Sequence, residues 1–113
     1  MPKTCCNQGV SLAGIHYGVV NEETAARLAE TFKVLADRSR VRIVHALSLA
    51  DELCVGHLCQ LVGMTPSAVS HQLRLLRGLN LVRTRREGQL VYYRLSDHHI
   101  TQLFNQALEH VLE

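Results

Sequence analysis

The sequence lacks any long apolar run. No stretch of 18 or more apolar residues occurs in its 113 residues, so we expect no transmembrane span. The opening residues, Met-Pro-Lys-Thr-Cys-Cys, have no apolar secretion-signal core, and internal repeats and low-complexity tracts are missing. These absences argue against membrane and secreted classes. They predict a cytoplasmic protein whose 47% apolar content supplies one modest core.

Acidic residues are scarce between Pro66 and Leu95, where Glu87 is the only one. The same segment holds half of the twelve basic residues, and all six are arginines: Arg74, Arg77, Arg83, Arg85, Arg86 and Arg94. Positive charge concentrated in this way predicts a polyanionic partner. Arginine in particular suits bidentate contacts with phosphate or guanine.

A basic amphipathic helix is predicted from Thr65 to Arg77. Thr65 suits the N-cap and a proline suits the first helical position, and Val69, Leu73 and Leu76 form one apolar stripe. The opposite face carries donors and cations without a carboxylate: Ser67, Ser70, His71, Arg74 and Arg77. Such a face fits a DNA major groove, whereas a solvated surface helix is the simpler alternative for this segment alone.

The neighbouring segments favour DNA. Residues 55–62 form a short helix closed by Gly63, and 63–65 give a turn typical of a helix-turn-helix. Residues 81–86 and 89–95 read as a hairpin around Glu87-Gly88. Its basic residues, Arg83, Arg85 and Arg86, would lie against the phosphate backbone. We therefore predict a mainly α fold with a small β-hairpin, a winged helix-turn-helix.

The remaining segments complete the predicted organisation. Residues 1–20 show no sustained period and are expected to form a flexible arm carrying Cys5, Cys6 and His16. Residues 21–113 form the DNA-binding and dimerisation domain, with helices that begin at Asn21 and Asp37. The terminal helix from Ser96 or Asp97 has an almost unbroken apolar stripe. That stripe can pack on its own domain or, as we expect, on a second copy, because DNA-binding dimers read two half-sites.

The terminal helix also carries candidate metal ligands, namely Asp97, His99, His110 and Glu113. Two histidines and two carboxylates suit tetrahedral Zn²⁺. His99 and His110 are separated by about 16 Å of helical rise, so one straight helix cannot bring both to one ion. An antiparallel second copy could complete two symmetric sites, whereas solvated or capping roles are the alternative.

The thiols form a second candidate site. Cys54, His57 and the arm residues Cys5 and Cys6 offer soft or borderline ligands for Zn²⁺, Cd²⁺ or Pb²⁺. Cys59 is expected in the core, where free cysteine is common. Because thiols in a reducing cytoplasm are more often ligands or redox groups than disulfides, a redox sensor using Cys5, Cys6, Cys54 and Cys59 stays open.

From about Glu22 to Glu113 the chain resembles the ArsR/SmtB family of metal-responsive winged-helix repressors, and within it the cyanobacterial-type zinc sensors. The resemblance rests on five motifs: residues 34–43 (VLADRSRVRI), 52–59 (ELCVGHLC), 67–73 (SAVSHQL), 91–94 (VYYR) and 97–100 (DHHI). It implies a homodimer that binds operator DNA when metal-free and leaves on binding metal. Zn²⁺ is the expected effector, with Cd²⁺, Pb²⁺ or Co²⁺ as alternatives.

The resemblance also assigns residues. Asp97, His99, His110 and Glu113 match the family's C-terminal-helix zinc site, and Cys54 matches a ligand of its other site. This chain has Gly56 where the family's cadmium, lead and arsenic sensors carry a second cysteine, although His57 could replace that ligand. A zinc hydrolase would need an open metal position and a cleft, and the short chain shows no loop to build one, so neither an enzyme nor a small-molecule substrate is expected.

Overall fold

A computed structural model describes residues 11–113 of the chain. The elements follow in the order α1 (Leu12–Gly18), α2 (Glu22–Leu35), α3 (Arg38–Ser48), β1 (Leu53–Cys54), α4 (Val55–Val62), α5 (Pro66–Gly78), β2 (Val82–Glu87), β3 (Leu90–Leu95) and α6 (His98–Leu112). The chain divides into two compact units, residues 1–30 and 31–113.

The first unit contains α1 and most of α2. Asn21 begins α2 as predicted, because its side-chain oxygen accepts a hydrogen bond of 2.8 Å from the Thr24 amide. The helix α1 was not predicted, since seven residues are too few to show a helical period, and all of them are exposed. The contact-based division falls after Glu30 rather than after residue 20. The flexible arm over residues 1–20 stays a prediction.

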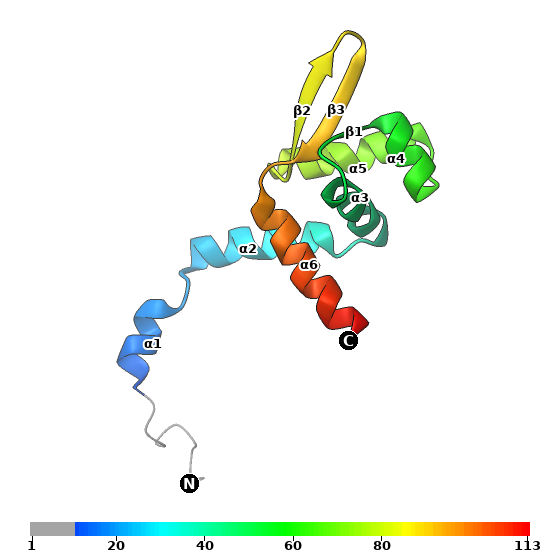
Figure 1. Cartoon of the computed structure of the whole chain (residues 1–113). Helices are drawn as coiled ribbons and strands as arrows, with labels where there is room; N and C mark the ends of the chain where they lie inside the picture. The colour runs from blue at the N-terminus through cyan, green and yellow to red at the C-terminus, as the bar shows by residue number, and fades with distance from the viewer. Residues whose placement is uncertain (1–10) are drawn as a thin grey trace. The chain divides into compact units, whose positions relative to one another are not determined.

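The second unit is built around one apolar core. Its buried side chains come from α3, α4, α5 and the start of the hairpin: Ile43, Val44, Leu47, Leu58, Val62, Val69, Leu73, Leu76, Leu81 and Val82. The predicted stripe of α5 is therefore its buried face, and the helix-turn-helix of α4 and α5 packs on α3 (Figure 1). The winged helix-turn-helix prediction is confirmed.

The sheet has three antiparallel strands in the order β1-β3-β2. Strands β2 and β3 form the predicted hairpin, whose two-residue turn places Gly88 at φ +62°. Positive φ is a conformation that glycine adopts without steric cost. Strand β1 was missed, because two residues cannot show strand alternation. It pairs Leu53 with Tyr93 and Cys54 with Tyr92.

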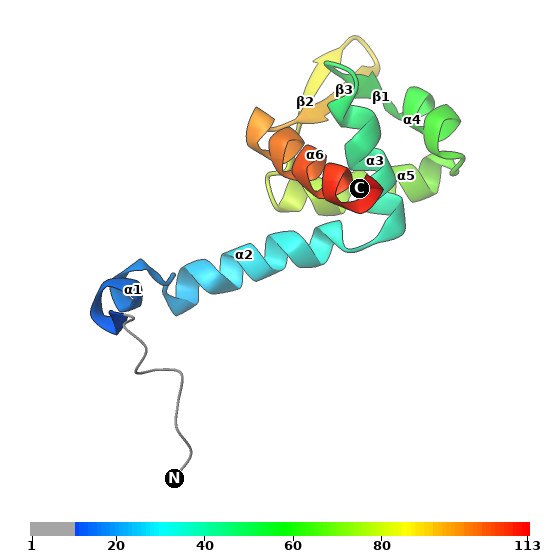
Figure 2. The ribbon, with the colours of Figure 1, turned by 60° about the horizontal axis from the view of Figure 1, so that its bottom comes forward.

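The helix α6 follows the hairpin and lies across α3 (Figure 2). Of the two predicted caps, Ser96 and Asp97, it is Asp97 that caps the helix, by accepting a 2.9 Å hydrogen bond from the His99 amide. Ile100 and Phe104 pack against the core, but no residue of α6 is buried, and Val111 is 75% exposed. Among residues 11–113, no helix is long and apolar enough to cross a membrane.

The packing of α4 gives a stability prediction. Leu58 is completely buried, so Leu58→Ala should lower the free energy of unfolding by about 2–5 kcal/mol through lost transfer energy and a residual cavity. Leu61→Ala is the matched control on the same helix, because Leu61 is 56% exposed, and its effect should stay below about 1 kcal/mol. Urea unfolding followed by circular dichroism, at one protein concentration, measures both. Equal losses would contradict the core assignment.

Candidate DNA-binding surface and metal sites

The helix α5 presents its polar face to solvent. Its N-cap is Thr65, whose hydroxyl oxygen accepts a 3.1 Å hydrogen bond from the Ala68 amide, and Pro66 occupies the first turn. Of the residues predicted to bind DNA on this helix, Ser67, His71, Arg74 and Arg77 are exposed, and Ser70 is half-buried. The structure thus gathers these predicted side chains on one accessible face.

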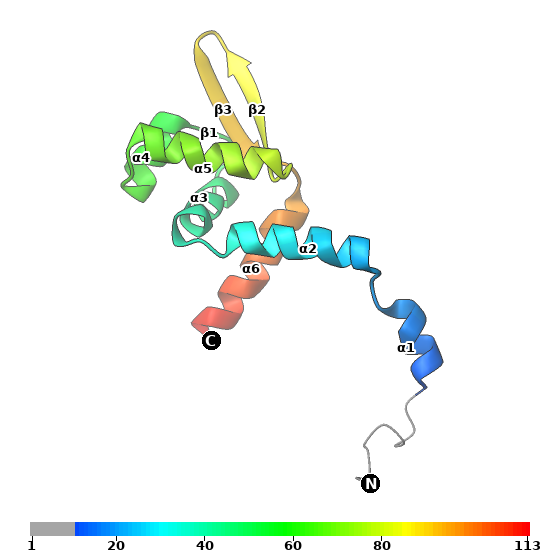
Figure 3. The same ribbon diagram turned by 180° about the vertical axis from the view of Figure 1, so that it is seen from behind.

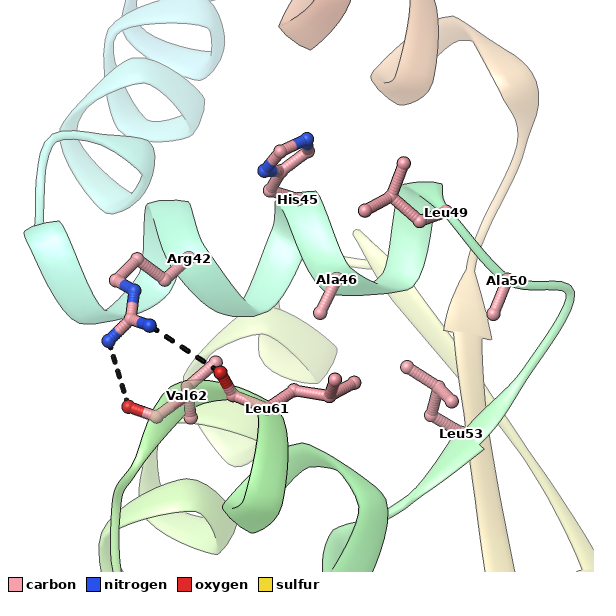
Figure 4. Close-up of a pocket in the computed structure, with 8 residues that line it drawn as sticks. All are labelled: Arg42, His45, Ala46, Leu49, Ala50, Leu53, Leu61 and Val62. Atoms are coloured by element: carbon pink, nitrogen blue, oxygen red, sulfur yellow. Dashed lines mark hydrogen bonds between the residues drawn. The ribbon is translucent and has the colours of Figure 1, made fainter.

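Two arginines of α3 hold the helix-turn-helix in place. Arg40 donates a 3.0 Å hydrogen bond to the side-chain oxygen of Gln72 on α5. Arg42 donates to the carbonyl oxygens of Val62 at 2.8 Å and Leu61 at 3.5 Å, at the end of α4 (Figure 4). The C-terminal carbonyls of a helix lack partners within it. A cation on α3 therefore satisfies them and fixes the angle of α4.

A cavity of about 370 Å³ lies beside this contact. It is lined by Arg42, His45, Ala46, Leu49, Ala50, Leu53, Leu61 and Val62 (Figure 4). Most of these side chains are aliphatic and none is acidic. The cavity offers neither a metal site nor a nucleophile with its base.

The wing arginines differ in their surroundings. Arg83 and Arg86 are exposed on β2, the outer strand of the sheet (Figure 3). Arg85 instead makes ion pairs with Glu52 and Glu87 and lies over the ring of Tyr92. Its charge is therefore already compensated within the unit. No local sequence pattern predicts this pairing, because Glu52 is 33 residues away from Arg85.

The C-terminal metal candidates lie at the two ends of α6. At its start, the Asp97 carboxylate is 3.3 Å from Nδ1 of His99. Partial desolvation opposes ionisation of Asp97, but hydrogen bonds from the backbone of residues 99 and 100 and the imidazole of His99 outweigh it, so the pKa of Asp97 is lowered. At the other end, His110 and Glu113 are exposed and three residues apart.

Each end of α6 therefore offers two donors. In the described part of one chain, no three His, Cys, Asp or Glu side chains come close enough together to hold a metal ion. This fits the helix geometry, which separates His99 from His110 by about 16 Å. Two imidazoles and two carboxylates suit Zn²⁺, and the two half-sets would need a second copy to meet.

The thiol candidates are only partly placed. Cys54 ends β1 and precedes α4, and His57 is exposed in the first turn of α4. Cys54 and Cys59 are both free and half-buried, and Cys59 packs against the core as predicted. Cys5 and Cys6 lie outside the described residues. The second metal site therefore stays a prediction.

An apolar groove runs along α6. It has a volume of about 370 Å³ and is lined by Phe32, Leu35, Val41, Leu103, Phe104, Ala107, Leu108 and Val111. Phe32 and Leu103 are 53% and 40% exposed. Phe104, which lines the groove, stacks on His45 of α3 with ring centroids 5.1 Å apart. The predicted stripe of α6 is thus only partly covered by its own unit.

Known proteins share this arrangement. Residues 37–84 match the model of the bacterial regulatory protein, arsR family. The chain is 44% identical over 95 residues to the transcriptional repressor SmtB homolog of Synechocystis sp., covering 84% of this chain and 71% of that protein. It is 43% identical over 86 residues to the cadmium resistance transcriptional regulatory protein CadC homolog of Staphylococcus aureus, covering 76% and 71%.

A solved structure agrees with the sequence comparisons. The solution structure of apo-NmtR superposes with a TM-score of 0.70 at 41% identity, covering 81% of this chain and 76% of that one. The family prediction is confirmed: the chain belongs to the arsR family of bacterial regulatory proteins and is a winged-helix transcriptional regulator rather than an enzyme.

Proposed function

We propose that this chain represses transcription as a homodimer that binds operator DNA when metal-free and is released on binding Zn²⁺. The observation that carries the DNA contact is the exposed polar face of α5, placed beside an arginine-bearing wing. The α5 residues Ser67, Ser70, His71, Arg74 and Arg77 would contact the major groove, whose width accepts a helix. Arg83 and Arg86 would contact phosphates.

A second copy is the proposed occupant of the groove along α6. The helix has a continuous apolar stripe, but its own unit buries none of its residues completely. Large exposed apolar patches mark interaction sites, and an isologous dimer joins one such patch to its twin. Two copies would also present two α5 helices, as two half-sites of an operator require.

The same arrangement would complete the metal site. Asp97 and His99 of one copy would meet His110 and Glu113 of the other, giving the nitrogen and oxygen ligands that Zn²⁺ accepts. Bound Zn²⁺ would supply a link between the two α6 helices. One similar relative is named for cadmium resistance, which supports a divalent effector in general. The donor set without sulfur favours zinc at this site.

A contact path leads from α6 to the DNA-binding helix. Phe104 of α6 stacks on His45 of α3, and Arg40 of α3 donates to Gln72 of α5. A shift of α6 against its twin would therefore pass through α3 to both α5 helices and change their spacing. Since binding linkage is reciprocal, DNA would weaken metal binding by the same factor by which metal weakens DNA binding.

Cys54 and His57 are a second candidate site, to be completed by Cys5 and Cys6. The observation in its favour is a pair of adjacent, incompletely buried donors: Cys54 at the N-cap of α4, making no side-chain cap hydrogen bond, and His57 one turn later. A thiol-based redox response would use the same cysteine together with Cys59.

The phosphate contacts give the first functional prediction. Arg83→Ala and Arg86→Ala should each weaken operator binding and reduce the slope of log K against log salt by about 0.9, the value for one lost phosphate contact. Arg38→Ala is the matched control, because Arg38 is exposed on α3, outside both α5 and the wing. Fluorescence anisotropy across a salt series, on a duplex selected by the wild-type protein from a random pool, measures the slopes. Equal slopes for all four proteins would remove the wing from the interface.

The proposed zinc site gives the second functional prediction. Zinc should reduce wild-type operator affinity by about 5- to 150-fold, the usual range of allosteric coupling. His110→Ala and Glu113→Gln should lose most of this response, whereas Glu109→Gln should keep it, because Glu109 lies on the same helix outside the proposed ligand set. Anisotropy titrations with and without Zn²⁺ provide the test. If His110→Ala releases DNA as the wild type does, α6 is not the controlling site.

The candidate thiol site gives the third functional prediction. If α6 controls the zinc response, the zinc-induced loss of operator affinity in Cys54→Ser should stay within about twofold of the wild-type loss. The reason is that the sulfur of Cys54 lies outside the N/O ligand set. Loss of the response in Cys54→Ser with retention in His110→Ala would assign control to the thiol site. If peroxide releases DNA from the wild type and the single substitution Cys54→Ser abolishes this release, the protein is a redox sensor.

A further inference from the structure

A cluster of four side chains joins the wing to the strand that precedes the helix-turn-helix. Arg85 on β2 makes a two-nitrogen contact with the Glu52 carboxylate, with its Nε at 3.1 Å from one oxygen. Its third nitrogen donates to Glu87 at 2.8 Å, and its guanidinium carbon is 4.8 Å from the Tyr92 ring centroid. We call Glu52, Arg85, Glu87 and Tyr92 the wing strap.

The strand register explains how these residues meet. Arg85 lies opposite Tyr92 of β3, and Tyr92 lies opposite Cys54 of β1 on its other side. Directly paired residues share one face of a sheet, and residues two apart on a strand do as well. Glu52 therefore extends from the β1 side toward the same face. The strap therefore joins β2 and β3 to the residue that directly precedes β1.

The positive charge of Arg85 is already matched by the carboxylates of the strap. The hydrogen bonds from Arg85 lower the pKa of Glu52, and those from Glu52 and Glu87 raise the pKa of Arg85. One guanidinium therefore contacts two carboxylates, and Arg94 places a second positive charge near Glu52. A DNA phosphate would have to compete with these carboxylates for Arg85, while the exposed Arg83 and Arg86 remain open to it.

Strand β1 is the weakest part of the sheet and also its link to the DNA-binding helices. It has only two residues, and Val55 of α4 follows Cys54 directly. Two residue pairs between β1 and β3 give little stability by themselves. A bidentate arginine–carboxylate contact adds a directional tie of defined geometry. The strap therefore connects the wing to the start of the helix-turn-helix.

We propose that Arg85 is a positioning residue that Glu52 fastens to β1, so that the strap sets the wing relative to α4 and α5, and that Arg85 is not a phosphate ligand. The inference rests on the operator binding proposed above and deepens it. It separates two wing arginines that would touch DNA from one that holds the wing in place, which the sequence could not distinguish.

The direction in which one substitution changes operator affinity tests the positioning role of Arg85. Glu52→Gln removes a negative charge near the DNA-binding surface, so simple electrostatics predicts tighter binding. The strap predicts weaker binding, by roughly two- to fivefold, because a partly exposed ion pair is worth about that factor. Asp51→Asn is the matched control, since it makes the same charge change at the neighbouring exposed residue. It should bind no more weakly than wild type.

The experiment is anisotropy on the selected duplex, across a salt series, for wild type, Glu52→Gln, Asp51→Asn, Arg85→Gln and the double variant Glu52→Gln/Arg85→Gln. We expect the salt slope of Glu52→Gln to equal that of Asp51→Asn, and the double variant to bind no more weakly than Arg85→Gln alone. Arg85→Lys, which keeps the charge but loses the bidentate contact, should also bind more weakly than wild type.

Two results would overturn the proposal. Tighter binding by Glu52→Gln than by Asp51→Asn, with a slope steeper by about 0.9, would make Arg85 a phosphate ligand held back by Glu52. Equal affinities of these two variants would leave the strap without a role in binding. Hydrogen exchange without DNA gives an independent measurement: the backbone amides of β1 should exchange faster in Glu52→Gln than in Asp51→Asn. That readout stands even if the wild type binds no operator.

Discussion

Burial of one face of α5 is the constraint on which the rest of the structure depends. Val69, Leu73 and Leu76 are completely or almost completely buried in the core. Rotation of the helix about its axis would therefore expose apolar surface, at a free-energy cost of about 25 cal/mol per Å². The polar side chains opposite them are thereby held outward. The face proposed to bind DNA is thus fixed by the same packing that stabilises the domain.

The helix α3 contacts both the helix-turn-helix and α6. Its buried residues support α4 and α5, its arginines bind Gln72 and the end of α4, and His45 stacks on Phe104 of α6. The proposed zinc response needs a route of contacts from α6 to α5. In this chain, α3 contacts both helices.

Much of this architecture could be read from the sequence because it depends on local patterns. The capping residues Thr65 and Asp97, the stripe of α5 and the turn at Gly88 each act within a few residues of chain. Strand β1 escaped notice because its two residues are specified by pairing with β3 rather than by their own pattern. The short helix α1 was missed for lack of a full apolar period.

The sequence by itself determined the class of the protein through a basic helix with one apolar stripe and a hairpin wing, and it supplied the N/O side chains of the last helix that are proposed as ligands. These features rest on residue type and helical or strand period, which are local properties. Only the tertiary structure decided which wing arginine is ion-paired, because Glu52 and Arg85 are 33 positions apart in the chain and meet across strand β3. Likewise, only packing showed that α6 keeps an incompletely covered apolar groove. Contacts distant in sequence depend on how elements are placed in space, and no local pattern encodes that placement.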